Sequence, residues 1–134
     1  MKTLAAEMFD WCTAQFGWKQ GVNAFLNILP DTNQVSGEAW WLIDTDSYVS
    51  QQMISKSKLK RYTLTLNYRH TKARVVDATI LKIEQILNHT TCFQLPSYKV
   101  IQMQASNWNA DQDVENENFY RGSLTITLDV LDTY

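Results

Sequence analysis

Residues 61–88, RYTLTLNYRHTKARVVDATILKIEQILN, decide the fold that this chain can adopt. Their first nine positions alternate between polar and apolar side chains, which is the period of a β-strand with one buried face. After His70 and Thr71 the spacing of the apolar residues changes to that of an amphipathic helix. The apolar helical positions are Val76, Ile80, Ile83 and Leu87. A strand that leads directly into an amphipathic helix predicts a small domain of the α+β class.

Similar patterns on both sides of this stretch predict the remaining elements. Thr3 is suited to cap a first helix that ends near Gly17, and a short apolar strand that begins at Ala24 is stopped by Pro30. The second helix is expected to close near Asn88-His89, with Asn88 tolerating a left-handed cap. Further strands are expected over residues 38–44 and 98–105 and at the end of the chain, before which residues 107–118 form a solvated loop. The final strand alternates like the first, with apolar Leu124, Ile126, Leu128 and Val130.

These apolar stripes predict a single core that joins both helices to the sheet. Its expected members are Met8, Trp11, Cys12, Leu64, Leu66, Ile80, Ile83, Leu87, Leu124, Ile126 and Leu128. The alternation also predicts a second, polar face of the sheet, made by Arg61, Thr63, Thr65, Asn67 and Arg69.

Length and composition indicate one domain, residues 1–134, with an ordinary hydrophobic core. No apolar run approaches the ~20 residues that crossing a bilayer needs, so no membrane partner is expected. Glu7 and Asp10 interrupt the N-terminal segment where an export signal would be apolar, so an intracellular protein is expected. Cys12 and Cys92 are then expected to be buried thiols and not a disulfide.

Charge is distributed unevenly along the chain. Seven of the twelve basic residues fall between residues 56 and 74, namely Lys56, Lys58, Lys60, Arg61, Arg69, Lys72 and Arg74. The C-terminal part is acidic, with Asp111, Asp113, Glu115, Glu117, Asp129 and Asp132 against Arg121. Opposite patches on one chain suit head-to-tail contact between identical copies. The alternative is that both regions are simply solvated.

Residues 45–59 are polar with scattered apolar points, and their pattern favours no single structure. The segment is either a long mobile loop or a hairpin arm that projects from the sheet. Long segments of this kind in compact domains tend to be functional. We expect it to contact a partner and to become ordered on assembly. Tyr48, Met53 and Ile54 would be its anchors, and Lys56 and Lys58 its steering charges.

No motif in the sequence indicates catalysis, and no cofactor is expected. The two cysteines and two histidines form no C-x-x-C or H-x₃-H pair, so no metal site is expected. His70 could act as a general base, but a polar residue in a turn is the simpler interpretation. Phosphate-binding and nucleophile motifs are missing from the sequence, so we expect a protein that is not an enzyme.

Nucleic-acid binding is the alternative function. The basic span Lys56–Arg74 is interleaved with Tyr62 and Tyr68, and basic residues next to aromatic ones can bind single strands. Against this, the two tyrosines share the face of Leu64 and Leu66 and should lie in the core. A sequence pI near 5.6 also lacks the basic character of a dedicated binder. Direct binding of nucleic acid is therefore not expected.

The order of elements resembles the minor capsid and tail terminator proteins of long-tailed bacteriophages and prophages. After an N-terminal helix, Asn27-Ile28-Leu29-Pro30-Asp31 is similar to the apolar segment of that family, which ends in Pro-Asp. Tyr68-Arg69 ends a strand that leads into the second helix. Leu95–Val100 and Tyr120-Arg121 precede the later strands in the same order. One departure is Asp46-Ser47-Tyr48-Val49, where relatives often carry paired glycines.

The resemblance implies a fold in which two helices cover one face of a mostly antiparallel sheet. It also implies a virion protein, assembled in the host cytoplasm, that forms a hexameric ring at the head–tail interface. Such a ring caps the tail tube, stops its polymerisation and gives the head a docking surface. The implied partners are further copies of the chain, the major tail tube protein and the head completion or connector proteins. Besides the 45–59 segment, the expected contact residues are Arg61, Arg69, Asp111, Asp113 and Arg121.

Overall fold

The computed structural model describes residues 3–27, 38–52, 58–90, 92–107, 111–112 and 119–131 of the chain. Its elements, in chain order, are α1 (Leu4–Phe16), β1 (Ala24–Leu26), β2 (Ala39–Gln52), β3 (Lys58–His70), α2 (Ala73–His89), β4 (Phe93–Gln94), β5 (Lys99–Asn107), β6 (Asp111–Gln112) and β7 (Tyr120–Leu131). The strands form one sheet in the order β1-β2-β3-β7-β5-β4, and β6 pairs with β7 outside this path. All neighbours are antiparallel except β1 and β2, so the fold is the mostly antiparallel α+β class expected from the sequence.

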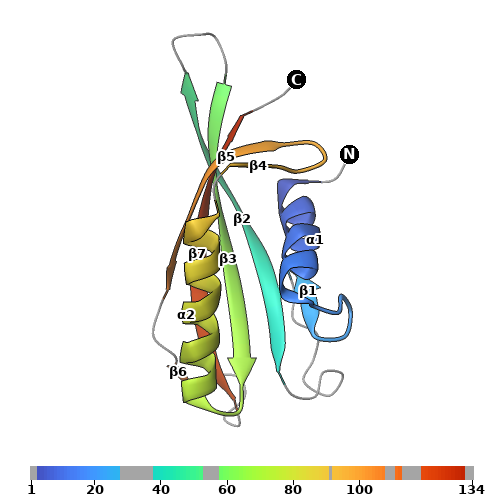
Figure 1. Cartoon of the computed structure of the whole chain (residues 1–134), viewed down its shortest axis with the longest axis vertical. Coiled ribbons are helices and arrows are strands. Elements are labelled where there is room, and N and C mark those ends of the chain that lie inside the picture. The colour runs from blue at the N-terminus through green and yellow to red at the C-terminus, as the bar shows by residue number, and fades with distance from the viewer. Residues whose placement is uncertain are drawn as a thin grey trace.

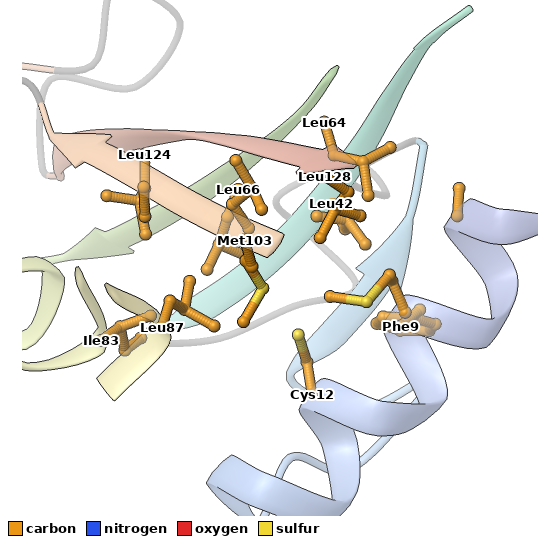
Figure 2. Close-up of a cluster of buried hydrophobic side chains, with 14 of the residues drawn as sticks. Phe9, Cys12, Leu42, Leu64, Leu66, Ile83, Leu87, Met103, Leu124 and Leu128 are labelled. Carbon is orange, nitrogen blue, oxygen red and sulfur yellow. The ribbon is translucent and has the colours of Figure 1, made fainter. Parts of the chain in front are cut away.

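Both helices pack on one face of the sheet: α1 lies against β1 and β2, and α2 lies over β3, β7 and β5 (Figure 1). Figure 2 shows where they meet the sheet: Cys12 projects from α1 and Leu87 from α2 toward Leu66 and Met103. All the residues expected in the core belong to this one cluster, with Trp11 only partly buried. Neither helix of the described residues is long and apolar enough to cross a membrane.

The β3–β7 pair forms the centre of the sheet, and its register explains why the core face is continuous. Leu64 lies opposite Ile126, and Leu66 lies opposite Leu124. These four side chains are at most 1% exposed. Because directly opposite residues of an antiparallel pair project to the same face, the two alternating sequence patterns combine into one apolar surface under the helices.

Gly122 allows α2 to approach the sheet closely. It lies opposite Tyr68 on β3, in a row that otherwise carries large side chains. A Cβ atom at this position would lie 2.7 Å from Val76 Cγ1 and 3.0 Å from Ile80 Cγ1, closer than van der Waals contact permits. The glycine is therefore required by the space that α2 occupies, and not by backbone conformation.

The ends of α1 follow the sequence expectation. The Thr3 hydroxyl accepts a hydrogen bond from the Ala6 N–H at 3.2 Å. Gly17 adopts φ = 69°, and its N–H donates to the Thr13 carbonyl. A hydroxyl at the N-cap and a left-handed glycine after the last turn satisfy backbone groups that the helix itself leaves unpaired.

The segment expected to be either a loop or an arm is a hairpin in its described part. β2 continues to Gln52, which pairs with Lys58 at the start of β3. The register shifts between Asp44 and Tyr48, where the sequence departs from the bacteriophage proteins that it resembles. Figure 1 shows β2 and β3 running past both helices to form one end of the molecule. Paired backbone hydrogen bonds explain how so polar a segment can be strand.

Three local expectations are wrong. Cys92 is exposed and only Cys12 is buried. α2 ends at His89, as expected, but Asn88 does not form a left-handed cap, because it lies inside the helix and the capping residue Thr90 is extended, with φ = −81°. The Asn88 amide instead bonds the backbone of Ala105 on β5, accepting from its N–H at 2.7 Å and donating to its carbonyl at 2.9 Å. The expected loop of residues 107–118 also contains a short strand, β6.

Candidate assembly surface

The face of β3 and β7 opposite the helices carries a ladder of matched polar pairs. The pairs are Arg61 with Asp129, Thr63 with Thr127, Thr65 with Thr125, Asn67 with Ser123, and Arg69 with Arg121. The four threonines are partly buried, so this polar ladder is half open to solvent. At its centre the Ser123 hydroxyl donates to Asn67 Oδ1 at 2.7 Å. Cross-strand pairs of threonine with threonine and of asparagine with serine therefore give this face of the sheet a polar surface.

One end of the polar ladder is an ion pair within the chain. Arg61 Nε donates to Asp129 Oδ1 at 2.8 Å, and Nη2 lies 3.3 Å from Oδ2. The hydrogen bond and charge of Asp129 raise the pKa of the Arg61 guanidinium. The Arg61 side chain is 47% exposed, whereas that of Asp129 is 12% exposed. One basic residue of the span 56–74, Arg61, is therefore already paired with an acidic C-terminal residue, Asp129, of the same chain.

The other end of the polar ladder is covered. Arg69 has 0% exposure, and its guanidinium carbon lies 4.2 Å from the centre of the Phe119 ring. Ala39, its partner on β2, is also fully buried, and Trp41 on the same face is 7% exposed. The expectation that Arg69 lies on an open polar face is wrong, because a cation over an aromatic ring is part of a second packed layer. The signal in the sequence was Trp41, a large apolar residue on the face assigned to solvent.

Strand pairing places some of the other expected contact residues next to this surface. Arg121 is exposed and lies between Arg69 on β3 and Asp111 on β6. Tyr48 on β2 pairs with Tyr62 on β3, in the part of the hairpin that lies away from Arg69. Lys58 begins β3. The other expected contacts, Met53, Ile54, Lys56 and Asp113, lie outside the described residues.

The aromatic residues of the basic span face the core. Tyr68 is 1% exposed, its ring lies 4.7 Å from that of Trp40, and its hydroxyl donates to Glu38 Oε2 at 2.6 Å. Burial, followed by the Glu38 contact, raises the pKa of the Tyr68 phenol. Tyr62 is partly buried and packs against the core. A ring that is already covered offers no platform for a base, so the stacking part of the nucleic-acid alternative is not available at Tyr68.

His70 fits the simpler of its two interpretations. Its Nδ1 atom accepts a hydrogen bond from the Lys72 N–H at 3.1 Å, across the turn that joins β3 to α2. Elsewhere in the part of the chain that the structure describes, no three His, Cys, Asp or Glu side chains gather as metal ligands would.

Sequence reasoning missed one buried acid. Glu7 is 2% exposed, and its Oε1 atom accepts a hydrogen bond from the Ser97 N–H at 2.7 Å. The signal was its position, because Leu4, Glu7, Met8 and Trp11 fall at i, i+3, i+4 and i+7 on one face of α1. An acid on the apolar stripe of a helix must be buried with the stripe.

The sequence matches no protein-family model and no curated protein. Among solved structures, the chain is similar to one chain of a structure described as the virion of a native gene transfer agent particle. The two are 11% identical in sequence and superpose with a TM-score of 0.63, over 97% of this chain and 99% of the other. At this identity the likeness is one of fold. The chain therefore shares its fold, over nearly its whole length, with a component of a gene transfer agent virion.

Proposed function

We propose that this chain is a structural subunit of a phage-like virion and, more specifically, the tail terminator. In this role six copies form a ring that caps the tail tube, stops further polymerisation and receives the head. The observation that carries the proposal is the fold shared end to end with a chain of a virion particle. The two helices over a mostly antiparallel sheet, expected from the resemblance, support it as well.

The geometry of the subunit is consistent with assembly and offers little for chemistry. Between its two ends the polar ladder consists of uncharged side chains, the paired threonines and Asn67 with Ser123. A surface of this kind buries well against a protein partner because its hydroxyls can exchange water for new hydrogen bonds. Arg61 and Arg121 belong to the ladder, and Asp111 pairs with Arg121 beside it. We assign these three residues to contacts between subunits or with the tail tube.

The β2–β3 hairpin is the second contact region of the proposal. Its strands extend beyond both helices, so neither helix covers this end of the sheet (Figure 1). We assign Tyr48, Met53, Ile54, Lys56 and Lys58 to partner contacts. Contacts made on assembly would offset the ordering cost of about 1–2 kcal/mol per residue.

A deletion tests the hairpin without disturbing any described strand. Because Gln52 and Lys58 are paired, residues 53–57 can be replaced by a two-residue Asn-Gly turn that closes the hairpin in register. The matched control replaces the same five residues with a Gly/Ser sequence of equal length. We expect both variants to fold as the parent does and to produce tails of irregular length, without heads, in a phage assembly system that depends on this chain.

Electron microscopy of the tails gives the readout, and light scattering gives the mass of the purified protein. Rings of six copies, alone or on tail tubes, are the expected assembly. Uniform tails with heads from both variants would show that the end of the hairpin makes no required contact. Normal tails from a system that lacks the chain entirely would overturn the tail terminator proposal itself.

A further inference from the structure

Glu7 has an unfilled hydrogen-bonding position. One oxygen accepts from the Ser97 N–H at 2.7 Å, whereas Oε2 is buried and has no hydrogen-bond partner among the described residues. A buried acceptor without a donor destabilises the folded chain, and the cost is larger when the group is charged. The position of Glu7 in the first turn of α1 offsets part of this cost through the helix dipole, but the dipole provides no donor.

Glu7 lines a pocket of about 540 Å³ between α1 and the turn that joins β4 to β5. Asp10 and Trp11 come from the same helix, and Leu95, Pro96 and Ser97 form the opposite wall. Within the described part of the chain, two carboxylates and no cationic side chain line this space. Asp10 also accepts from Gln20 Nε2 at 2.8 Å, which holds its carboxylate in place.

Trp11 gives the pocket a rigid aromatic wall. Its indole stacks on Phe93, with ring centres 4.8 Å apart, and meets the edge of Phe16 at 6.4 Å. A fixed indole beside two carboxylates suits a long apolar stem that ends in a cation, because the stem packs on Leu95 and Pro96 while the cation meets the carboxylates and the ring. Lysine and arginine are the side chains with this shape and charge.

We propose that this pocket receives a lysine or arginine side chain from the β2–β3 hairpin of a second copy of the chain. The sequence concentrates Lys56, Lys58 and Lys60 at that end of the hairpin, so the two regions are complementary in charge. Figure 1 shows the β2–β3 hairpin extending beyond α1, so this end of the sheet is not covered by α1 of the same chain. The inference rests on the proposed ring and identifies the acceptor of its basic region.

A peptide provides the direct test. The probe is acetylated and amidated Ser-Lys-Ser-Lys-Leu-Lys-Arg, the sequence of residues 55–61, titrated into the whole chain and followed by NMR at the Trp11 indole N–H. Glu7→Gln keeps the acceptor for Ser97 and the side-chain volume but removes the charge. We expect it to weaken binding at least tenfold, and Asp10→Asn to weaken it less. Glu84→Gln, a carboxylate on α2 outside the pocket, is the control and should bind as the parent does.

Three results would overturn the inference. The first is that Glu7→Gln binds the peptide as the parent does and has an unchanged melting temperature. The second is that a peptide whose basic residues are all glutamine binds equally well. The third is that Lys2→Gln greatly increases the affinity for the peptide. The last result would mean that the chain fills the pocket with its own Lys2. A mass measurement of the parent chain is independent of these results. Rings without peptide binding would leave the tail terminator proposal intact, whereas peptide binding without rings or tail capping would count against that proposal alone.

Discussion

The two faces of the β3–β7 pair have the same backbone geometry and very different surroundings. On the helix side, Leu64, Leu66, Leu124 and Ile126 are at most 1% exposed and pack into one core. On the other side, the threonines at the matching positions are only partly buried. Period-two alternation therefore separates a face that stabilises the fold by burial from a polar face that is partly open to solvent.

The polar face is itself divided, which the apolar face is not. Arg69 at one end has no exposed surface and lies over Phe119, whereas Arg61 at the other end is exposed and paired with Asp129. Two arginines on one strand and one face therefore differ in role. The buried arginine belongs to the packing of the subunit, and the exposed one belongs to its surface.

The largest effect is expected from Leu66→Ala on the apolar face. Removing a fully buried leucine loses transfer free energy and leaves a cavity, at a cost of about 2–5 kcal/mol in the free energy of unfolding. Urea melts followed by circular dichroism measure the loss. A cost below about 1 kcal/mol would contradict the β3–β7 register, which places Leu66 at the centre of the core.

Gly122→Ala tests the same face from the opposite direction, by adding an atom. The new Cβ would lie 2.7 Å from Val76 Cγ1, so α2 or its side chains must move. Overpacking of this kind costs about 1–3 kcal/mol. Val76→Ala in the same chain should recover part of the loss, because it removes the atom that clashes. Additive losses in the double variant would contradict the close approach of α2.

The buried thiol of Cys12 should make the free energy of unfolding depend on pH. Burial raises the pKa of Cys12 to about 12, from an ordinary value of 9.0. A raised pKa in the folded state means that the unfolded chain loses its proton first, so stability is complete below pH 9 and falls as pH rises toward 12. The expected slope approaches about 1.4 kcal/mol per pH unit above about pH 9.

Denaturant melts at a series of pH values, read against two variants, measure this slope. Cys12→Ala should flatten it between about pH 8.5 and 9.5, below the pKa of about 10 at which the phenols of the unfolded chain ionise. Cys92→Ala is the matched control, since Cys92 is exposed, and should leave the slope unchanged. An equal flattening by both substitutions would show that Cys12 is not protected by the core.

The smallest effect is expected from Thr65→Ala on the polar face. Thr65 lies opposite Thr125 and is partly buried, so the substitution removes one cross-strand pair worth about 0.2–1 kcal/mol. Urea melts alongside those of Leu66→Ala make the comparison direct. Similar losses for these two neighbouring residues would mean that the strand has no distinct buried face.

Much of this fold could be predicted because it depends on local patterns. Alternation of polar and apolar residues predicted β3 and β7, and helical spacing of apolar residues predicted α2. Thr3 and Gly17 predicted where α1 begins and ends. The core followed, since apolar stripes can be buried in few ways once their elements are known. The course of the hairpin could not be predicted, because its strands are held by backbone pairing and not by a pattern of side chains.

The candidate surface was less predictable because it depends on which polar residues are covered. Alternation places Arg69 on the polar face, and apart from Trp41 on the same face the sequence gives no sign that the guanidinium packs over Phe119. Glu7 and Ser97 are far apart in the chain and meet through a single hydrogen bond. Contacts of this kind arise from tertiary structure, and a single sequence contains no spacing that encodes them.

The bond between Asn88 and β5 has a consequence for how the protein can assemble. Among the described strands, β4 covers only Val100 and Lys99 of β5, so most of β5 is a sheet edge to which a strand of another chain could add. The Asn88 amide occupies both the N–H and the carbonyl of Ala105 on this edge. A strand that added to this edge would have to displace the Asn88 side chain from Ala105, so the bond with α2 disfavours pairing of β5 with another chain at this residue.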